Sequence, residues 1–161
     1  SEEGLMRFDG YRFKLMGDAD DGTSEMRSER IQYLYAEKSG NVWVATTTRL
    51  FRYASDKRRF RSFPLETQSG DGILGGDLHG IFESADGTVW VVTESGLCRF
   101  LSAEEAFVHY PYPQPWEIGI SERFSFAEAG SHIWMNVSGN IFSFDRENDR
   151  ISMVETAGIV E

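Results

Sequence analysis

Side chains with binding chemistry gather in the polar segments that separate strand-like runs of this sequence. Three such segments cover residues 17–29, 65–77 and 111–121. An aromatic platform surrounded by planar polar groups is typical of a carbohydrate-binding site. The candidate ligand-binding residues in and beside these segments and the intervening short turns are Arg49, Asp77, His79, Glu94, Tyr112 and Trp116. The prolines around the two aromatic residues would stiffen a platform, and the alternative is that Trp116 packs back onto the strands.

An acidic run in the first polar segment resembles the start of a calcium-binding loop. Alternate carboxylates followed by glycine can wrap a hard cation, and Asp18, Asp20 and Glu25 would supply the oxygen ligands. The rest of an EF-hand spacing is missing, so a solvated acidic loop is the favoured interpretation. The three histidines, His79, His109 and His132, occupy different positions of the repeat described below, and we do not expect them to converge on a metal.

Catalytic motifs are not found in the sequence. It contains no nucleophile elbow, no HExxH and no CxxC. Glycoside hydrolysis needs a facing pair of carboxylates, and nothing marks such a pair among the glutamates. The single cysteine, Cys98, excludes an intramolecular disulfide and is expected to be a small buried filler. We therefore predict a non-enzymatic chain with no cofactor.

Bulk composition limits the function classes. The 161 residues are 14% aromatic and carry a formal net charge of −10, which argues against disorder and against general nucleic-acid binding. The one basic cluster, residues 57–61, reads as a solvated hairpin tip. No apolar run is long enough to span a bilayer and no signal peptide is visible. The strand pattern that starts close to Ser1 leads us to expect a piece of a longer polypeptide.

A repeat of about 45 residues organises the whole chain. Residues 40–53 recur at 87–100 and, more loosely, at 131–144, while residues 4–10 match only the second half. The repeated tryptophans, Trp43, Trp90 and Trp134, are 47 and 44 residues apart. Each period carries four short alternating runs and turn residues, which is typical of a β-propeller blade.

The sequence therefore predicts an all-β fold, a partial β-propeller of about three and a half four-stranded antiparallel blades. The half blade covers residues 4–16, and whole blades cover 30–64, 78–111 and 122–155 within a single domain, 1–161. Because a blade lies between two others, both faces of its sheet should be mostly apolar, with the tryptophan rings filling the space between blades. In such a fold the three polar segments and the turns between second and third strands lie at the same end.

The motif at Asp86–Phe100, Asp-Gly-x-Val-Trp-Val followed by Gly-Leu-x-Arg-Phe, resembles the two-component regulator propeller repeat. Residues 39–53 fit the motif with Arg49 in place of glycine, and residues 130–144 are a degenerate copy. The resemblance implies the periplasmic sensor region of bacterial hybrid two-component histidine kinases. It places the chain on the periplasmic side of an inner membrane protein. Many members of that family respond to products of polysaccharide breakdown.

The expected function is accordingly a non-catalytic fragment of a ligand-sensing propeller, with oligosaccharides as the expected ligand. Expected partners are the rest of the sensor protein and a second copy joined through open blade edges, but no nucleic acid. Two alternatives remain open from the residues alone. One is a propeller enzyme acting on polysaccharide, a lyase or a glycosidase, and the other is a protein-interaction scaffold.

Overall fold

The computed structural model describes residues 5–16, 26, 30–65, 77–113, 124–137 and 139–154. The chain divides into two compact units, which are Ser1–Ile73 and Leu74–Glu161. The described regular structure is β-strand: β1 (Met6–Phe8), β2 (Phe13–Leu15), β3 (Ile31–Ala36), β4 (Val42–Thr46), β5 (Arg49–Ala54), β6 (Arg59–Pro64), β7 (Leu78–Glu83), β8 (Val89–Thr93), β9 (Gly96–Leu101), β10 (Ala106–Pro111), β11 (Phe124–Ala129), β12 (His132–Val137), β13 (Asn140–Asp145) and β14 (Arg150–Met153).

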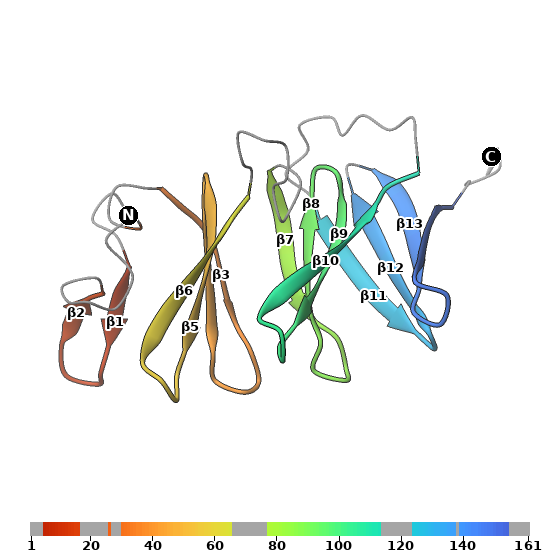
Figure 1. The fold of residues 1–161 in the computed structure, drawn as a ribbon. Coiled ribbons are helices and arrows are strands. Elements are labelled where there is room, and N and C mark those ends of the chain that lie inside the picture. The colour runs from red at the N-terminus through yellow and green to blue at the C-terminus, as the bar shows by residue number, and fades with distance from the viewer. Residues whose placement is uncertain are drawn as a thin grey trace. The chain divides into compact units, whose positions relative to one another are not determined.

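The first unit holds a two-stranded and a four-stranded sheet. Strand β1 pairs with β2, and β3 to β6 form an antiparallel meander in chain order (Figure 1). One face of the meander buries Val44, Phe51 and Phe60 together with Met26. Leu5 and Met16, at the two ends of the β1–β2 hairpin, pack against this cluster. The hairpin is therefore held to the meander by apolar contact.

The second unit consists of two four-stranded antiparallel meanders, β7 to β10 and β11 to β14. They lie side by side in Figure 1. A single core joins them, because Phe82, Trp90 and Tyr110 of one sheet share a buried cluster with Met135 and Phe144 of the other. Gly80 makes the close approach possible, since a β-carbon there would lie 2.4 Å from the ring of Phe124. The two sheets therefore stack face to face, as consecutive blades do.

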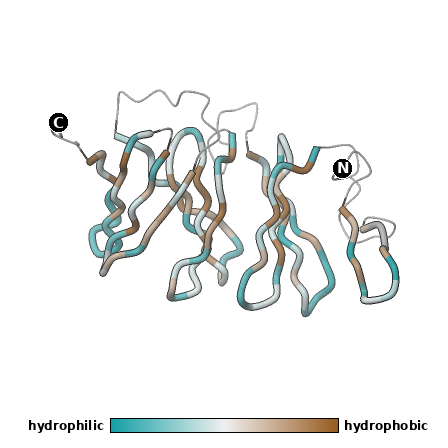
Figure 2. Tube along the Cα trace, turned by 180° about the vertical axis from the view of Figure 1, so that it is seen from behind, coloured by the Kyte–Doolittle hydropathy of each residue, from teal (hydrophilic) through white to brown (hydrophobic). Residues whose placement is uncertain are grey.

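These sheets confirm the predicted all-β, partial-propeller fold. Apolar residues follow the strands, and hydrophilic residues mark the hairpin turns (Figure 2). Strands β7 to β10 run from Leu78 to Pro111. That residues 1–161 form a single domain remains a prediction.

The third tryptophan differs from the prediction. Trp43 and Trp90 are fully buried, but Trp134 is 38% exposed. Its cross-strand neighbours are Ala127 and Ser143, where Trp90 has Phe82 and Arg99. Because no described strand covers this outer face of the β11–β14 sheet, the ring does not fill a space between two sheets. His132 is the first residue of β12.

Each four-residue tip between third and fourth strands ends in a left-handed residue. Arg58, Glu105 and Asp149 have φ angles of 51°, 48° and 49° and occupy the same position of the repeat. A non-glycine side chain in this conformation costs about 1 kcal/mol. The hairpins therefore form despite a local penalty, because strand pairing on both sides fixes the turn.

We predict that Arg58→Gly stabilises the chain by about 0.5–1 kcal/mol, because glycine adopts the required φ without strain. The matched control is Lys57→Gly, which alters an exposed residue of the same tip whose φ is not positive. It should give no gain. Urea unfolding followed by circular dichroism measures both changes. Equal effects of the two substitutions would contradict the strain at position 58.

Candidate ligand-binding site

The turn between β8 and β9 forms a rigid end of the β7–β10 sheet. The Thr93 hydroxyl donates a hydrogen bond to the carbonyl of Gly96 at 3.1 Å. A β-carbon on Gly96 would lie 2.2 Å from the carbonyl oxygen of Tyr110, so only glycine fits there. Thr46 makes the matching contact with Arg49 in the β3–β6 sheet, at 3.0 Å. These repeated hydrogen bonds therefore hold the backbone at this end of each sheet in a fixed conformation.

Three of the sequence-predicted site residues come together beside this turn. We call Asp77, His79 and Glu94 the loop-end cluster. The backbone N–H of Glu94 donates to the carbonyl of Asp77 at 2.8 Å, which ties the turn to the segment that enters β7. The register of β7 on β8 shifts between Leu78 and Gly80, which makes His79 the extra residue of a β-bulge. Bulges redirect side chains and are frequent beside binding sites.

Burial of the His79 ring disfavours its charged form. Burial lowers the pKa of His79 below 6.5, and the nearby charges of Asp77 and Glu94 only partly oppose this. Its Nε2 atom is buried and has no hydrogen-bond partner among the residues that the structure describes. Both carboxylate residues are exposed. The cluster thus presents two acceptors to solvent beside a neutral imidazole.

A second histidine at this end was not identified from the sequence as a site residue. His109 Nε2 lies 2.9 Å from the hydroxyl of Ser95, the residue after Glu94. Burial lowers the pKa of His109 as well. The carbonyl of Ser95 accepts a hydrogen bond from the N–H of Tyr112 at 3.0 Å. The pairing of β9 with β10 brings these groups together, and residue types alone do not reveal it.

The other predicted site residues lie elsewhere or outside the described residues. Tyr112 is 2% exposed, and its ring centroid lies 4.5 Å from that of Phe142 in the core. Arg49 belongs to the first unit, where its guanidinium donates to the Ser62 hydroxyl at 3.4 Å. Trp116 and the candidate cation ligands Asp18, Asp20 and Glu25 fall outside the described residues. Ligand binding by these residues remains a prediction.

Charge is divided unevenly between the two units. By sequence, residues 1–73 carry 12 basic and 12 acidic side chains, whereas residues 74–161 carry 4 and 14. The whole net charge of −10 therefore belongs to the second unit, which holds the loop-end cluster. The negative potential there would repel an acidic ligand, would leave a neutral one unaffected and would attract a cationic one.

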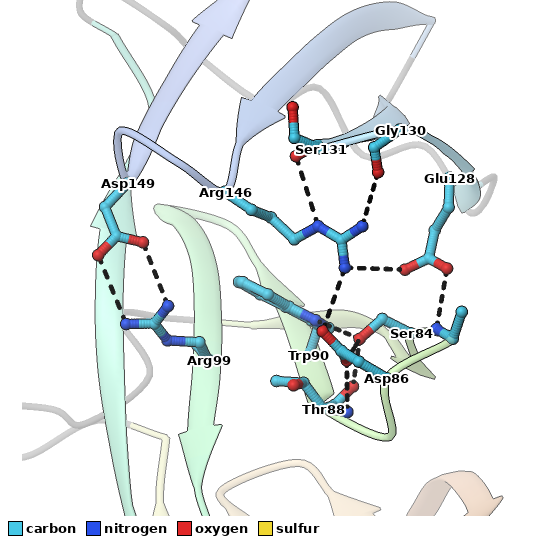
Figure 3. Close-up of polar contacts among 11 residues, drawn as sticks. Ser84, Asp86, Thr88, Trp90, Arg99, Glu128, Gly130, Ser131, Arg146 and Asp149 are labelled. Atoms are coloured by element: carbon cyan, nitrogen blue, oxygen red, sulfur yellow. Dashed lines mark hydrogen bonds and ion pairs between the residues drawn. The ribbon is translucent and has the colours of Figure 1, made fainter.

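Polar contacts fasten the two sheets of the second unit at the opposite end of the strands (Figure 3). The guanidinium of Arg146 donates to the carbonyl of Gly130 at 2.8 Å and pairs with Asp86 of the β7–β8 turn at 3.2 Å. Glu128 accepts a hydrogen bond from the backbone N–H of Ala85 at 2.8 Å. Hydrogen bonds from Ser84 and the Thr88 backbone lower the pKa of Asp86 to about 2. The contacts hold the sheets together and leave the other end to the loop-end cluster.

A repeated arginine holds the tryptophan of each complete motif. Arg52 lies over the ring of Trp43 at 5.6 Å, and Arg99 lies over that of Trp90 at 6.0 Å. Their carboxylate partners differ. Arg52 pairs within its own sheet with Glu37 at 2.8 Å, whereas Arg99 reaches Asp149 of the neighbouring sheet at 3.2 Å. The arginine at this position of the repeat therefore forms an ion pair within one sheet in the first unit and an ion pair between two sheets in the second unit.

Glu37 is the most strongly perturbed carboxyl of the first sheet. Burial alone would raise its pKa, but hydrogen bonds from Arg52, Ser39 and Asn41 outweigh it and lower the pKa from 4.5 to about 2. Glu37 also accepts the indole N–H of Trp43 at 2.7 Å. The group is thus a structural acceptor, and its ionised form is the one that the fold favours.

Two structural findings bear on cofactors and membranes. Among the described residues, no group of three or more histidine, cysteine, aspartate or glutamate side chains is arranged to hold a metal ion. The same part of the chain contains no helix that is long and apolar enough to cross a membrane.

Comparisons with known proteins identify the fold. No family model matches the chain, and no curated protein does. Solved structures do match. The extracellular domain of the hybrid two-component system BT3049 from B. thetaiotaomicron aligns with a TM-score of 0.68 at 20% identity, over 98% of this chain and 23% of that one. The corresponding domain of BT4673 from the same organism aligns with a TM-score of 0.64 at 17% identity, over 95% and 20%.

An enzyme is among the structural matches as well. Virginiamycin B lyase from Staphylococcus aureus aligns with a TM-score of 0.58 at 17% identity, over 80% of this chain and 42% of the lyase. At these identities the likeness shows the fold. This chain therefore has the fold of about a fifth of the extracellular domains of BT3049 and BT4673, which confirms the resemblance predicted from the repeat.

Substituting Glu37 should make stability depend less on pH. We predict that Glu37→Gln costs about 2 kcal/mol at pH 7, because Arg52 loses its ionic partner. The pKa of Glu37 is lower in the fold than its ordinary value of 4.5, so its contribution is complete above pH 4.5 and is lost as the pH falls through about 2. Urea unfolding between pH 7 and pH 2 measures the difference from wild type, which should shrink over that range. A difference that is constant across the range, or no larger than that of Asp56→Asn on the exposed tip, would contradict the assignment.

Cys98 should resist thiol reagents in the native protein. The residue is fully buried, and burial raises the pKa of its thiol to about 12, so almost no thiolate is present at neutral pH. We expect an aromatic disulfide reagent to label Cys98 only after unfolding in urea. Rapid labelling of the native chain would show that the residue is not the buried filler that the structure describes.

Proposed function

We propose that this chain is part of the ligand-sensing propeller of a hybrid two-component sensor, that it faces the periplasm and that it has no catalytic activity of its own. The observation that supports this most directly is the alignment of nearly the whole chain with extracellular domains of two such systems. The motif at residues 86–100 supports it independently, because it resembles the repeat of that sensor family. The rest of the sensor protein is then the chain's principal partner.

We propose further that the loop-end cluster contributes to the binding of a neutral oligosaccharide. The exposed carboxylates of Asp77 and Glu94 are acceptors for sugar hydroxyl groups, and the turn that carries Glu94 is held rigidly. Rigid acceptors lose little entropy when a ligand binds. The negative charge of the second unit favours a neutral sugar over a uronic one.

A lyase is the second candidate function, since virginiamycin B lyase shares the fold. A lyase needs a base that reaches the substrate proton. In this chain the Nε2 atom of His79 is enclosed, and that of His109 lies against Ser95. These placements favour binding over proton transfer at the loop-end cluster.

The test is calorimetric titration of the complete sensor propeller with a panel of neutral and uronic oligosaccharides. We expect a neutral oligosaccharide to bind, and Asp77→Asn or Glu94→Gln to weaken it about tenfold, the equivalent of one lost charge-assisted hydrogen bond of about 1.4 kcal/mol. The matched control is Glu104→Gln, which removes a carboxylate from the exposed hairpin tip at the other end of the sheet.

The possible results separate the proposals. Binding that none of the three substitutions alters would contradict the role of the loop-end cluster but not sensing. Binding of uronic sugars alone would contradict the ligand class. Turnover of any sugar in the panel would contradict the non-catalytic assignment.

A further inference from the structure

The end of the β3–β6 sheet at which the β3–β4 and β5–β6 turns lie is strongly basic. By sequence, residues 5–16 and 30–65 carry 11 basic and 3 acidic side chains. The exposed basic residues at these two turns are Lys38, Lys57, Arg58 and Arg59. We call these four residues the basic tip.

A hydrogen bond joins the two turns that carry the basic tip. The backbone N–H of Ser55 donates to the side-chain oxygen of Asn41 at 3.1 Å. The fold therefore brings Lys38 to the same end of the sheet as residues 57–59, although the sequence separates them. Their positive charges then act together on whatever approaches this end.

The carboxylates of these turns do not balance the charge of the basic tip. Glu37 pairs with Arg52 at 2.8 Å and also accepts the indole N–H of Trp43 at 2.7 Å, so its charge serves the inside of the sheet. Asp56 is the one other carboxylate that the sequence places in the two turns. The surface therefore has a net positive charge in a chain whose total is −10.

The repeat itself does not require a basic residue at this turn. The three tips between third and fourth strands have the same positive φ, and the residues that adopt it are Arg58, Glu105 and Asp149. The tip of the β7–β10 sheet, residues 102–105, contains two glutamates and no basic residue. The turn conformation thus accepts either sign of charge, and the formation of the hairpin does not explain why the first unit has a positive one.

An exposed aromatic side chain lies on the neighbouring hairpin of the same unit. The Asp9 carboxylate accepts the backbone N–H groups of Tyr11 and Arg12, both at 3.0 Å, and this fixes the β1–β2 turn. Tyr11 is 96% exposed. Figures 1 and 2 show this turn at the same end of the unit as the β5–β6 turn. Tyrosine is enriched at membrane–water interfaces, because its ring is apolar and its hydroxyl is polar.

We propose that the basic tip and Tyr11 form a docking surface for an anionic phospholipid membrane, with the basic side chains at the lipid phosphates and the tyrosine ring at the headgroup level. Basic residues close to an anionic leaflet each add to the attraction, and an interfacial aromatic ring adds apolar contact. The proposal goes beyond ligand sensing and does not depend on the ligand of the loop-end cluster. It gives the two hairpins of the first unit a role in orienting the chain on a membrane.

A broad surface fits the basic tip better than a small anion does. Sites for small ligands are concave, whereas the basic tip and Tyr11 lie on turns that project from the ends of their sheets (Figure 2). A stable protein interface needs a large complementary area, and four long, flexible basic side chains supply little of it. Lipid headgroups can rearrange around such side chains. The negative charge of the second unit is screened beyond about 8 Å at physiological ionic strength, so it weakens the attraction only where it lies close to the membrane.

The experiment is co-sedimentation of the full chain with lipid vesicles at low salt. One set is phosphatidylcholine, and in the other about a third of the lipid is phosphatidylglycerol. We expect binding to the anionic set alone, and its loss in about 0.5 M salt. The double variant Lys57→Gln, Arg59→Gln should bind about thirtyfold more weakly, since each basic side chain near the surface contributes about fivefold. Tyr11→Ser should weaken binding severalfold without changing the charge.

The matched control is the double variant Arg30→Gln, Arg150→Gln. It removes the same charge from two exposed positions outside the basic tip and should change binding by about twofold or less. Circular dichroism verifies that each variant is folded. Equal binding to both sets of vesicles, no binding to either, or equal losses in the two double variants would overturn the proposal. Binding to soluble polyglutamate but not to vesicles would overturn it in favour of an acidic protein partner. Release from vesicles by millimolar glycerol phosphate would overturn it in favour of a small soluble phosphate.

Discussion

A buried indole ring must keep a partner for its N–H group, because an unpaired polar group in a core costs several times what a typical hydrogen bond contributes. The chain meets this requirement in the turn that precedes each buried tryptophan. Glu37 accepts from Trp43 at 2.7 Å, and Ser84 accepts from Trp90 at 3.1 Å. In the second unit, the ring of Trp90 can then lie on the face that the β11–β14 sheet covers. Ala129, the last residue of β11, takes the corresponding place before Trp134 and has no side-chain acceptor, and that tryptophan is 38% exposed.

The stacking of the two sheets of the second unit places aromatic rings at the centre of their contact and ion pairs at its hairpin end. Phe82 and Phe126 stack at 3.9 Å, and Trp90 meets Phe144 edge-on at 5.1 Å, so the centre of the contact is aromatic. The ion pairs of Arg99 and Arg146 lie at the hairpin end, where partial exposure limits each to about 1 kcal/mol or less. Apolar burial therefore provides most of the attraction, and the ion pairs set the alignment of the sheets. The loop-end cluster lies at the opposite end of the strands from these ion pairs. Functional residues are commonly carried at the ends of a scaffold that is held rigid in this way.

The repeat predicted the strands well because the sequence pattern that marks each strand and each turn is local. Alternating apolar residues and glycine turns each depend on a few adjacent residues, and the spacing of Trp43 and Trp90 shows the same local pattern recurring. The side-chain partners were not predictable in the same way. Asp149 lies 50 residues from Arg99, and Asp86 lies 60 residues from Arg146, so both pairs exist only after two sheets have stacked.

The candidate site was predictable only in part for a related reason. Asp77, His79 and Glu94 come from one sheet and follow from its hairpin register, so their proximity could be expected from the repeat. The bulge that redirects His79 and the burial of Tyr112 against Phe142 depend on packing that residue types do not encode.

The central claim is that the β7–β10 and β11–β14 sheets stack as consecutive blades through their aromatic faces. A double-mutant cycle on Trp90 and Phe144, with leucine at each position singly and together, measures that contact directly by urea unfolding. The structure predicts a favourable coupling energy of about 0.5–1.5 kcal/mol, as edge-to-face ring pairs give. A coupling of zero, with both single variants folded, would show that the two rings do not meet and would contradict the stacked arrangement.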